Sequence, residues 1–150
     1  MSNFPIFGKN GNMKHRFICL FPFLSLFCAL NAIQAQTNFH SSASDLQPGK
    51  PFENVLVQKL YSDPHASGFV IWIKQQVPPH KHESHSETVF VLDGKGEMRL
   101  GDQMRIVRKG DILFIPQGTP HAVKVTKGVL KVLSIQAPEF DGTDRVPLEN

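Results

Sequence analysis

Three histidines and one glutamate are the residues of this chain whose types and spacing could support metal chemistry. His80 and His82 flank a single lysine, Glu87 follows five positions after His82, and His121 comes from a distant segment. Side chains alternate between the two faces of an extended strand, so His80 and His82 are expected to project to the same side. Glu87 lies at an odd offset from His82, and a bend or bulge must correct its direction. The set predicts a mononuclear site for a divalent cation.

Such a site would leave room for other molecules on the ion. Three nitrogen donors and one oxygen donor leave one or two positions of an octahedral ion open, which suits reactive Fe(II), Mn(II), Ni(II) or Cu(II). The alternative is that these are ordinary polar residues of a turn. The intervening segment 83–86, with Glu83, Ser84, His85 and Ser86, is hydrophilic enough for that.

The elements that must position these residues are short strands separated by turns. β-Branched and aromatic runs without a helical period alternate with segments rich in Gly, Pro and Asp, a pattern typical of a sandwich or a closed barrel. No segment has an amphipathic helical stripe, so an all-β fold is expected. The predicted strands cover residues 55–61, 69–73, 88–92, 97–100, 103–107, 112–115, 121–125 and 129–135, with turns at 93–96 and 126–128 among those between them.

The spacing of these residues resembles the two sequence motifs of the cupin superfamily. The first motif is matched by His80-x-His82, four residues, Glu87, six residues and Gly94. The second is matched by Gly110, five residues, Pro116-x-Gly118, two residues and His121. The resemblance covers residues 55–135 and is to the small single-domain cupins. It implies one double-stranded β-helix, or jelly-roll, barrel of antiparallel strands, with the metal ligands His80, His82, Glu87 and His121.

Two residues near the motifs need separate comment. The second motif often ends with Asn where this chain has Val125, which leaves the ligand set intact and makes the barrel interior more apolar. His85 could orient a metal ligand from behind it, or act as an acid or base at the pocket mouth, because imidazole titrates near neutral pH. The alternative for His85 is a solvated loop residue. The catalytic assignment of His85 is therefore a hypothesis.

Cupin barrels have diverse functions, so function must be argued from the site. The first hypothesis is a metal-dependent enzyme of oxygenase, decarboxylase or isomerase type that acts on a small oxygen-rich molecule. Fe(II) or Mn(II) is favoured as the one divalent ion, with Ni(II), Cu(II) or Zn(II) as alternatives. The second hypothesis is a non-catalytic binding module for a small oxygen-rich ligand or sugar, and the third an accessory subunit. A homodimer is expected by resemblance and because exposed sheet edges need cover.

The first 35 residues have the composition of a secretory signal. A basic start at 14–16 precedes an apolar run at 17–30 and a small residue at Ala35, and the run is short for a membrane span. Cleavage is expected near Ala35, and Met13 is an alternative start. The resulting organisation is a signal peptide at 1–35, a flexible or loosely docked arm at 36–51 and a barrel domain at 52–150. The protein is therefore expected in the periplasm or secreted.

Removal of this leader changes the charge and the chemistry of the chain. Three of the 16 Lys and Arg residues and none of the 13 Asp and Glu residues lie in it, which leaves 13 of each. A neutral mature domain gives no reason to expect nucleic-acid binding or a stable membrane association. Cys19 and Cys28 are the only cysteines, and both lie in the leader. A disulfide, a thiolate-bound zinc and a cysteine nucleophile are therefore excluded from the mature domain.

Overall fold

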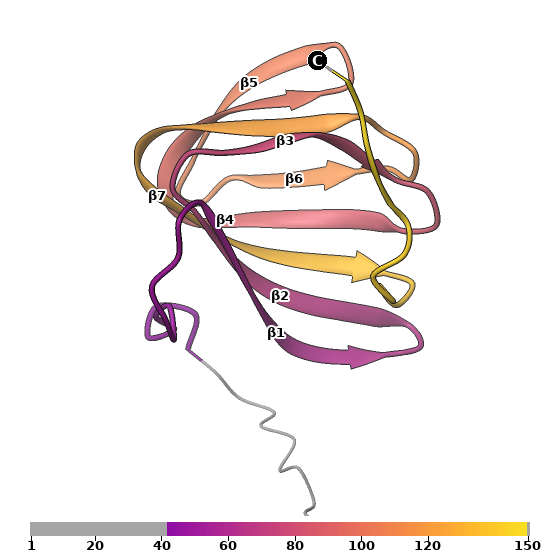
Figure 1. Ribbon diagram of the computed structural model, residues 1–150, viewed down its shortest axis with the longest axis horizontal. Coiled ribbons are helices and arrows are strands. Elements are labelled where there is room, and N and C mark those ends of the chain that lie inside the picture. Colours follow the sequence, from indigo (N-terminus) through magenta and orange to yellow (C-terminus); the bar gives the residue numbers. More distant parts are fainter. Residues whose placement is uncertain (1–41, 150) are drawn as a thin grey trace, which may run out of the picture. The chain divides into compact units, whose positions relative to one another are not determined.

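The computed structural model describes residues 42–149, which form an antiparallel sheet rolled into a half-barrel (Figure 1). The described residues contain strands and turns and no helix, which confirms the expected all-β class. Within this range, no helix is long and apolar enough to cross a membrane. The predicted signal peptide lies outside the described residues. The strands are β1 (Val55–Asp63), β2 (Ala66–Ile73), β3 (Gln76–His82), β4 (Ser86–Leu100), β5 (Gln103–Arg108), β6 (Ile112–Ile115), β7 (His121–Ala137) and β8 (Arg145–Pro147).

Two long bent strands, β4 and β7, organise the barrel. They pair from Ser86 opposite Ala137 to Leu100 opposite His121. The first part of β7 also pairs with β3, and its second part pairs with β2. On its other edge, β4 carries β6 along its first part and β5 along its second. His121, at the start of β7, therefore lies between β3 and β4.

The length of β4 and β7 corrects the sequence prediction. Turns were expected at 93–96 and 126–128, but the chain continues through both segments as strand. The ladder between β4 and β7 shifts its register around Asp93 and Lys95, so the strands bend without reversing. Gly94 has a φ of +82°, and a Cβ there would lie 2.4 Å from the carbonyl oxygen of Val129. Glycine is needed because the backbones approach closely at the bend.

The barrel interior is packed with apolar side chains from five strands. Alternation along β2 sends Ile71 and Ile73 inward, whereas Trp72 packs on the opposite side. Full burial of side chains of this size stabilises the fold by about 1.5–3 kcal/mol each. The buried cluster consists of Ile73, Val91, Met98, Val107, Ile115, Leu130 and Val132.

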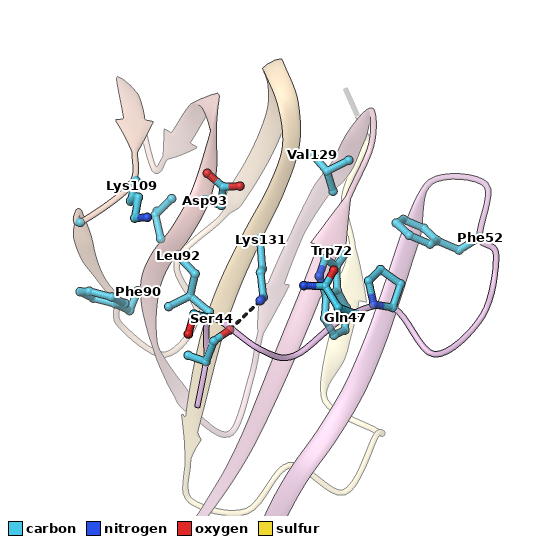
Figure 2. A pocket seen from close by; sticks show the side chains of 14 residues that line it. Ser44, Gln47, Phe52, Trp72, Phe90, Leu92, Asp93, Lys109, Val129 and Lys131 are labelled. Carbon is cyan, nitrogen blue, oxygen red and sulfur yellow. Dashed lines mark hydrogen bonds between the residues drawn. The ribbon is translucent and has the colours of Figure 1, made fainter. Parts of the chain in front are cut away.

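The described part of the N-terminal arm, residues 42–51, contacts the outer side of the barrel. The buried ammonium group of Lys131 donates hydrogen bonds of 2.6 Å to the carbonyl oxygens of Ala43 and Leu46. It also lies 5.8 Å from the centre of the Trp72 ring. Figure 2 shows Lys131 and Trp72 beside the arm at the base of a cavity of about 540 Å³. The buried ammonium thus ties the arm to β2 and β7.

The C-terminal tail extends the sheet. Its strand β8 pairs with β3, opposite Lys81 and both histidines of the first motif. In Figure 1 it is the yellow trace that leaves β7 and runs back to the C-terminus. The backbone amide of Glu83 also donates to the carbonyl oxygen of Asp144. The tail is therefore attached along the strand that carries His80 and His82.

Candidate metal centre

The structure brings His80, His82, Glu87 and His121 together inside the barrel. All four are buried, with exposed fractions between 4% and 7%. One ligand atom from each histidine lies within 4.8 Å of the others. The Glu87 Oε2 atom lies 3.5 Å from His121 Nε2 and 3.8 Å from His82 Nε2. The four side chains therefore converge on one point, as the residue pattern predicts.

Local backbone structure gives each ligand its direction. His80 and His82 alternate with the more exposed Lys81 along β3, and both face inward. A bend at 83–85 then separates β3 from β4 and corrects the odd offset of Glu87, as expected. His121 is directly opposite His80 in the pairing of β7 with β3. The prolines at 78 and 79 fall where this ladder shifts register, a position at which the missing amide hydrogens are tolerated.

Backbone carbonyl groups set the tautomers of two histidines. His80 Nδ1 lies 2.9 Å from the carbonyl oxygen of Pro78, and His121 Nδ1 lies 3.0 Å from that of Thr119. A carbonyl oxygen only accepts, so each Nδ1 carries the hydrogen and each Nε2 keeps its lone pair. His121 Nε2 is buried and has no hydrogen-bond partner among residues 42–149. A buried lone pair without a donor is what a metal ligand requires.

The carboxylate of Glu87 is held by two side chains of β7. Ser134 Oγ donates a hydrogen bond to Glu87 Oε1, and Gln136 Nε2 lies 3.5 Å from the same oxygen. Both side chains are buried, and Gln136 is opposite Glu87 in the β4–β7 ladder. These contacts occupy Oε1, so Oε2 is the oxygen that faces His82 and His121.

The protonation states of three of the four side chains, His80, His82 and Glu87, suit a divalent cation. Burial lowers the pKa of His80 to about 4, with a further contribution from the charge of His121. Burial likewise lowers the pKa of His82 to about 4. Burial would raise the pKa of Glu87, but its contacts with His121 and Ser134 outweigh this and lower the pKa to about 2. At neutral pH, His80 and His82 are neutral and Glu87 is ionised, and metal binding needs these forms.

His85 and Asp144 form a second buried cluster behind His82. His85 is only 1% exposed, so the alternative of a solvated loop residue is wrong. Its ring packs 4.2 Å from the His82 ring, and its Nδ1 lies 2.7 Å from Asp144 Oδ2. Asp144 Oδ1 lies 3.7 Å from His82 Nδ1. Asp144 is itself fixed by Ser84, whose backbone amide and hydroxyl donate to Oδ2 at 3.0 and 2.8 Å.

Sequence reasoning missed Asp144, Ser134 and Gln136. Ser134 and Gln136 share a strand face, and their alternation on β7 was a signal that could have pointed to buried polar residues. Asp144 gave no such signal, because it lies in a tail of turn-forming residues and reaches the site only through the pairing of β8 with β3.

Two cavities meet at the four converging residues. A small interior cavity of about 90 Å³ is lined mainly by core side chains such as Met98 and Leu130, with His121 at its edge. A larger cavity of about 330 Å³ lies at the barrel mouth and includes His82 in its lining. His80 and Glu87 border both cavities. The donor set and the buried lone pair of His121 fit a divalent ion that could be reached from the mouth. His85 lines neither cavity.

Comparison with known proteins gives matches in sequence. A family model described as a cupin domain matches residues 69–136. An uncharacterized protein of Aquifex aeolicus is 38% identical over 97 residues, which is 65% of this chain and 80% of that protein. Quercetin 2,3-dioxygenase of Bacillus subtilis is 35% identical over 57 residues, which is 38% of this chain but only 17% of the enzyme.

Solved structures extend the likeness to the whole barrel. A Klebsiella pneumoniae protein with a double-stranded β-helix domain has a TM-score of 0.64 and 17% identity, covering 75% of this chain and 93% of that one. Streptomyces PAC13 with uridine has a TM-score of 0.60 and 15% identity, covering 74% and 91%. At these identities the likeness concerns the fold. Motif spacing, sequence matches and barrel architecture agree, and the chain belongs to the cupin superfamily as a small single-domain member.

Proposed function

We propose that this chain is a metal-dependent enzyme that acts on a small oxygen-rich molecule at the barrel mouth. One observation carries the proposal: four buried donor side chains converge where the mouth cavity meets the core. His80, His82, Glu87 and His121 would hold one divalent ion, with Fe(II) or Mn(II) favoured. The similarity of one segment to quercetin 2,3-dioxygenase supports oxygenase-type chemistry, with decarboxylase or isomerase chemistry as the other enzyme types.

In this proposal, the role of the chain's own residues is to bind the ion and to orient the side chains that hold it. A bound ion of this kind supplies Lewis-acid activation and, with Fe(II) or Mn(II), redox reactivity. Pro78 and Thr119 fix the rings of His80 and His121 through their carbonyl groups, and Ser134 fixes the Glu87 carboxylate. His85, assigned from the sequence as a catalytic residue, acts in this proposal through Asp144 as a positioning residue. Its burial beside His82 supports that role, because it lines neither cavity.

Metal analysis on purified, untagged protein tests the proposal. We expect one divalent ion per chain, lost in His121→Ala and retained in His65→Ala, which removes an exposed turn histidine. Oxygen uptake and product analysis with small keto acids, diols and uronates should show turnover that Glu87→Gln abolishes. A protein that takes up no divalent ion would overturn the proposal.

The second candidate is a non-catalytic module that uses the same ion to anchor a small ligand or sugar. We call His80, His82, Glu87 and His121 the metal-type residues. One observation favours the second candidate: His85, the side chain predicted as acid or base, lines neither of the two cavities that these residues border. Stoichiometric binding of metal and ligand without turnover on the panel would support this candidate over the enzyme.

We further propose that the protein is exported and forms a homodimer. Export is supported by the leader-like composition of residues 1–35, and mass measurement of the mature chain would identify the cleavage point. The dimer is supported by apolar side chains on strands β5 and β6, where Ile106, Ile112 and Phe114 are 54–68% exposed. Sedimentation of the protein and of Phe114→Glu would test the dimer, which the substitution should weaken.

A further inference from the structure

The cavity at the barrel mouth has an unusual distribution of charge. Most of its wall is apolar, with Val57 from β1, Phe69 from β2 and Phe140 from the tail. His80, His82 and Glu87 also line the cavity, and Arg145 is the only lysine or arginine in its lining. A single fixed cation in an apolar wall indicates a ligand with one anionic group and an apolar body.

The backbone fixes Arg145 beside the metal-type residues. Arg145 is the first residue of β8 and is directly opposite His82 in the pairing of β8 with β3. It follows Asp144, which is buried behind His82 and held by Ser84. Arg145 also lines the mouth cavity together with His80, His82 and Glu87. Its position beside these residues is therefore set by the pairing of β8 with β3.

The guanidinium group of Arg145 is available to a ligand. In the described range 42–149 it makes no ion pair within 4.0 Å and no hydrogen bond, although five donors are present. By contrast, Arg105 on β5 donates to the side chain of Gln103 and the carbonyl oxygen of Met104. Lys81 pairs with Glu83 at 2.9 Å. Arg145 is partly exposed to solvent and lines the mouth cavity, so its donors can exchange water for a ligand.

The shape of a guanidinium selects the anion. Its planar fork matches the two oxygens of a carboxylate, and such charge-assisted pairs are stronger than neutral hydrogen bonds. A dianionic phosphate would bring more charge into a wall that is mostly apolar and already contains ionised Glu87, at a greater desolvation cost. A cavity of about 330 Å³ is at the lower end for small-molecule sites, so the ligand should be small.

We propose that Arg145 binds the carboxylate of a small organic acid whose apolar part packs against Phe69 and Phe140 at the barrel mouth. The proposal rests on the metal-dependent function above, and it narrows the oxygen-rich molecule proposed there to a carboxylic acid that also has an apolar part. The carboxylate lies at Arg145, and the rest of the molecule faces His80, His82 and Glu87.

Matched acids and amides test the proposal on the whole chain. The probes are phenylacetate, 3-phenylpropanoate and 4-methylpentanoate, each with its carboxamide, together with phenylphosphonate, measured by calorimetry. They are added to chelator-treated protein and again after saturation with Mn(II). At least one acid should bind about tenfold more tightly than its amide in both states. Arg145→Gln should abolish this difference, Arg145→Lys should retain part of it, and Arg105→Gln, the same change on another face, should leave it intact.

Several outcomes would overturn the proposal. These are equal binding of every acid and its amide, a preference that survives in Arg145→Gln, tighter binding of phenylphosphonate than of any acid, and a preference seen only with Mn(II) present. In the last case the metal and not Arg145 would hold the carboxylate. Metal content is measured separately on the same samples. A chain that binds no metal but discriminates through Arg145 would refute the proposed function alone, whereas metal binding without discrimination would refute the present inference alone.

Discussion

At the scale of single residues, the site combines four metal-type side chains with groups that fix their direction. Carbonyl oxygens hold His80 and His121, Ser134 holds Glu87, and Asp144 lies behind His82. A buried imidazole that is held in its neutral form binds a cation without first losing a proton. In the metal-free protein, the buried imidazoles of His80 and His82 must stay uncharged, and this lowers the stability of the fold at acidic pH.

The metal-free protein should therefore lose stability as the pH falls from about 6.5 to about 4. The pKa of His80 and of His82 is lowered on folding, so the unfolded chain takes up protons first in this range. Glu87 extends this loss of stability to lower pH, because folding lowers its pKa from 4.5 to about 2. Its contribution to the free energy of unfolding is present above pH 4.5 and is lost as the pH falls towards 2. Denaturant midpoints at a series of pH values after chelation measure this. Midpoints that do not change between about pH 6.5 and about pH 4 would contradict it.

Substitution of Asp144 should weaken metal binding without removing a ligand. Asp144→Asn keeps the shape of the side chain but removes the charge next to His82 and His85, and loss of such supporting groups lowers metal affinity about 10–100-fold. The matched control is Asp141→Asn in the same tail, where the carboxylate is exposed and accepts hydrogen bonds from Thr143. Competition with a chromophoric chelator measures both affinities. Equal affinities for the two variants would refute a positioning role for Asp144.

At the scale of elements, the site depends on two long bent strands and one added strand. The bends in β4 and β7 let each strand contribute to both halves of the barrel, and Glu87 and His121 lie near opposite ends of their β4–β7 ladder. At the bend, Gly94 has a left-handed backbone conformation and contacts the backbone of Val129. The positions of these two metal-type residues therefore depend on a glycine that does not itself belong to the site.

Gly94→Ala should destabilise the barrel more than Gly101→Ala. Both glycines have positive φ, which costs about 1–2 kcal/mol for an alanine. At Gly101 a Cβ would have no atom within 4 Å, whereas at Gly94 it would lie 2.4 Å from the Val129 carbonyl oxygen. Thermal or denaturant unfolding of the two variants compares them. A Gly94→Ala protein as stable as the Gly101→Ala protein would show that the close approach is relieved at no cost.

These elements also show what the sequence could predict. Strand segments and the local pair His80-x-His82 follow from alternation over a few residues. The barrel and the expected ligand set follow from the resemblance of the motif spacing to that of the cupins. The same local rules assigned turns at 93–96 and 126–128, because a glycine that bends a strand and one that reverses it have similar sequence surroundings. Asp144 could not be found, since its place depends on pairing between strands far apart in the chain.

At the scale of the whole molecule, metal binding and folding are expected to be linked. The described domain has no cysteine, and the four metal-type residues come from β3, β4 and β7. An ion bound only by the folded barrel stabilises it by mass action. A bound ion would thus join β3, β4 and β7, which are otherwise held together by backbone hydrogen bonds and by the apolar core.

Saturation with Mn(II) should raise the unfolding temperature, and a chelator should reverse the rise. At a free metal concentration of about 100 times the dissociation constant, the expected stabilisation is about 2.7 kcal/mol. Calorimetry with and without the ion measures the shift, and His121→Ala should show none. A shift of equal size in His121→Ala would mean that the ion binds elsewhere.

The attachment of the tail to β3 has a consequence for the order in which the protein becomes functional. His80 is directly opposite both His121 and Pro147, so the first ligand strand receives its two neighbours from the last part of the chain. Contacts of such long sequence separation form late and slowly in folding. The four metal-type residues, with Arg145 beside them, therefore come together only once β7 and β8 have docked on β3. The complete donor set for the proposed ion is expected to form late in folding.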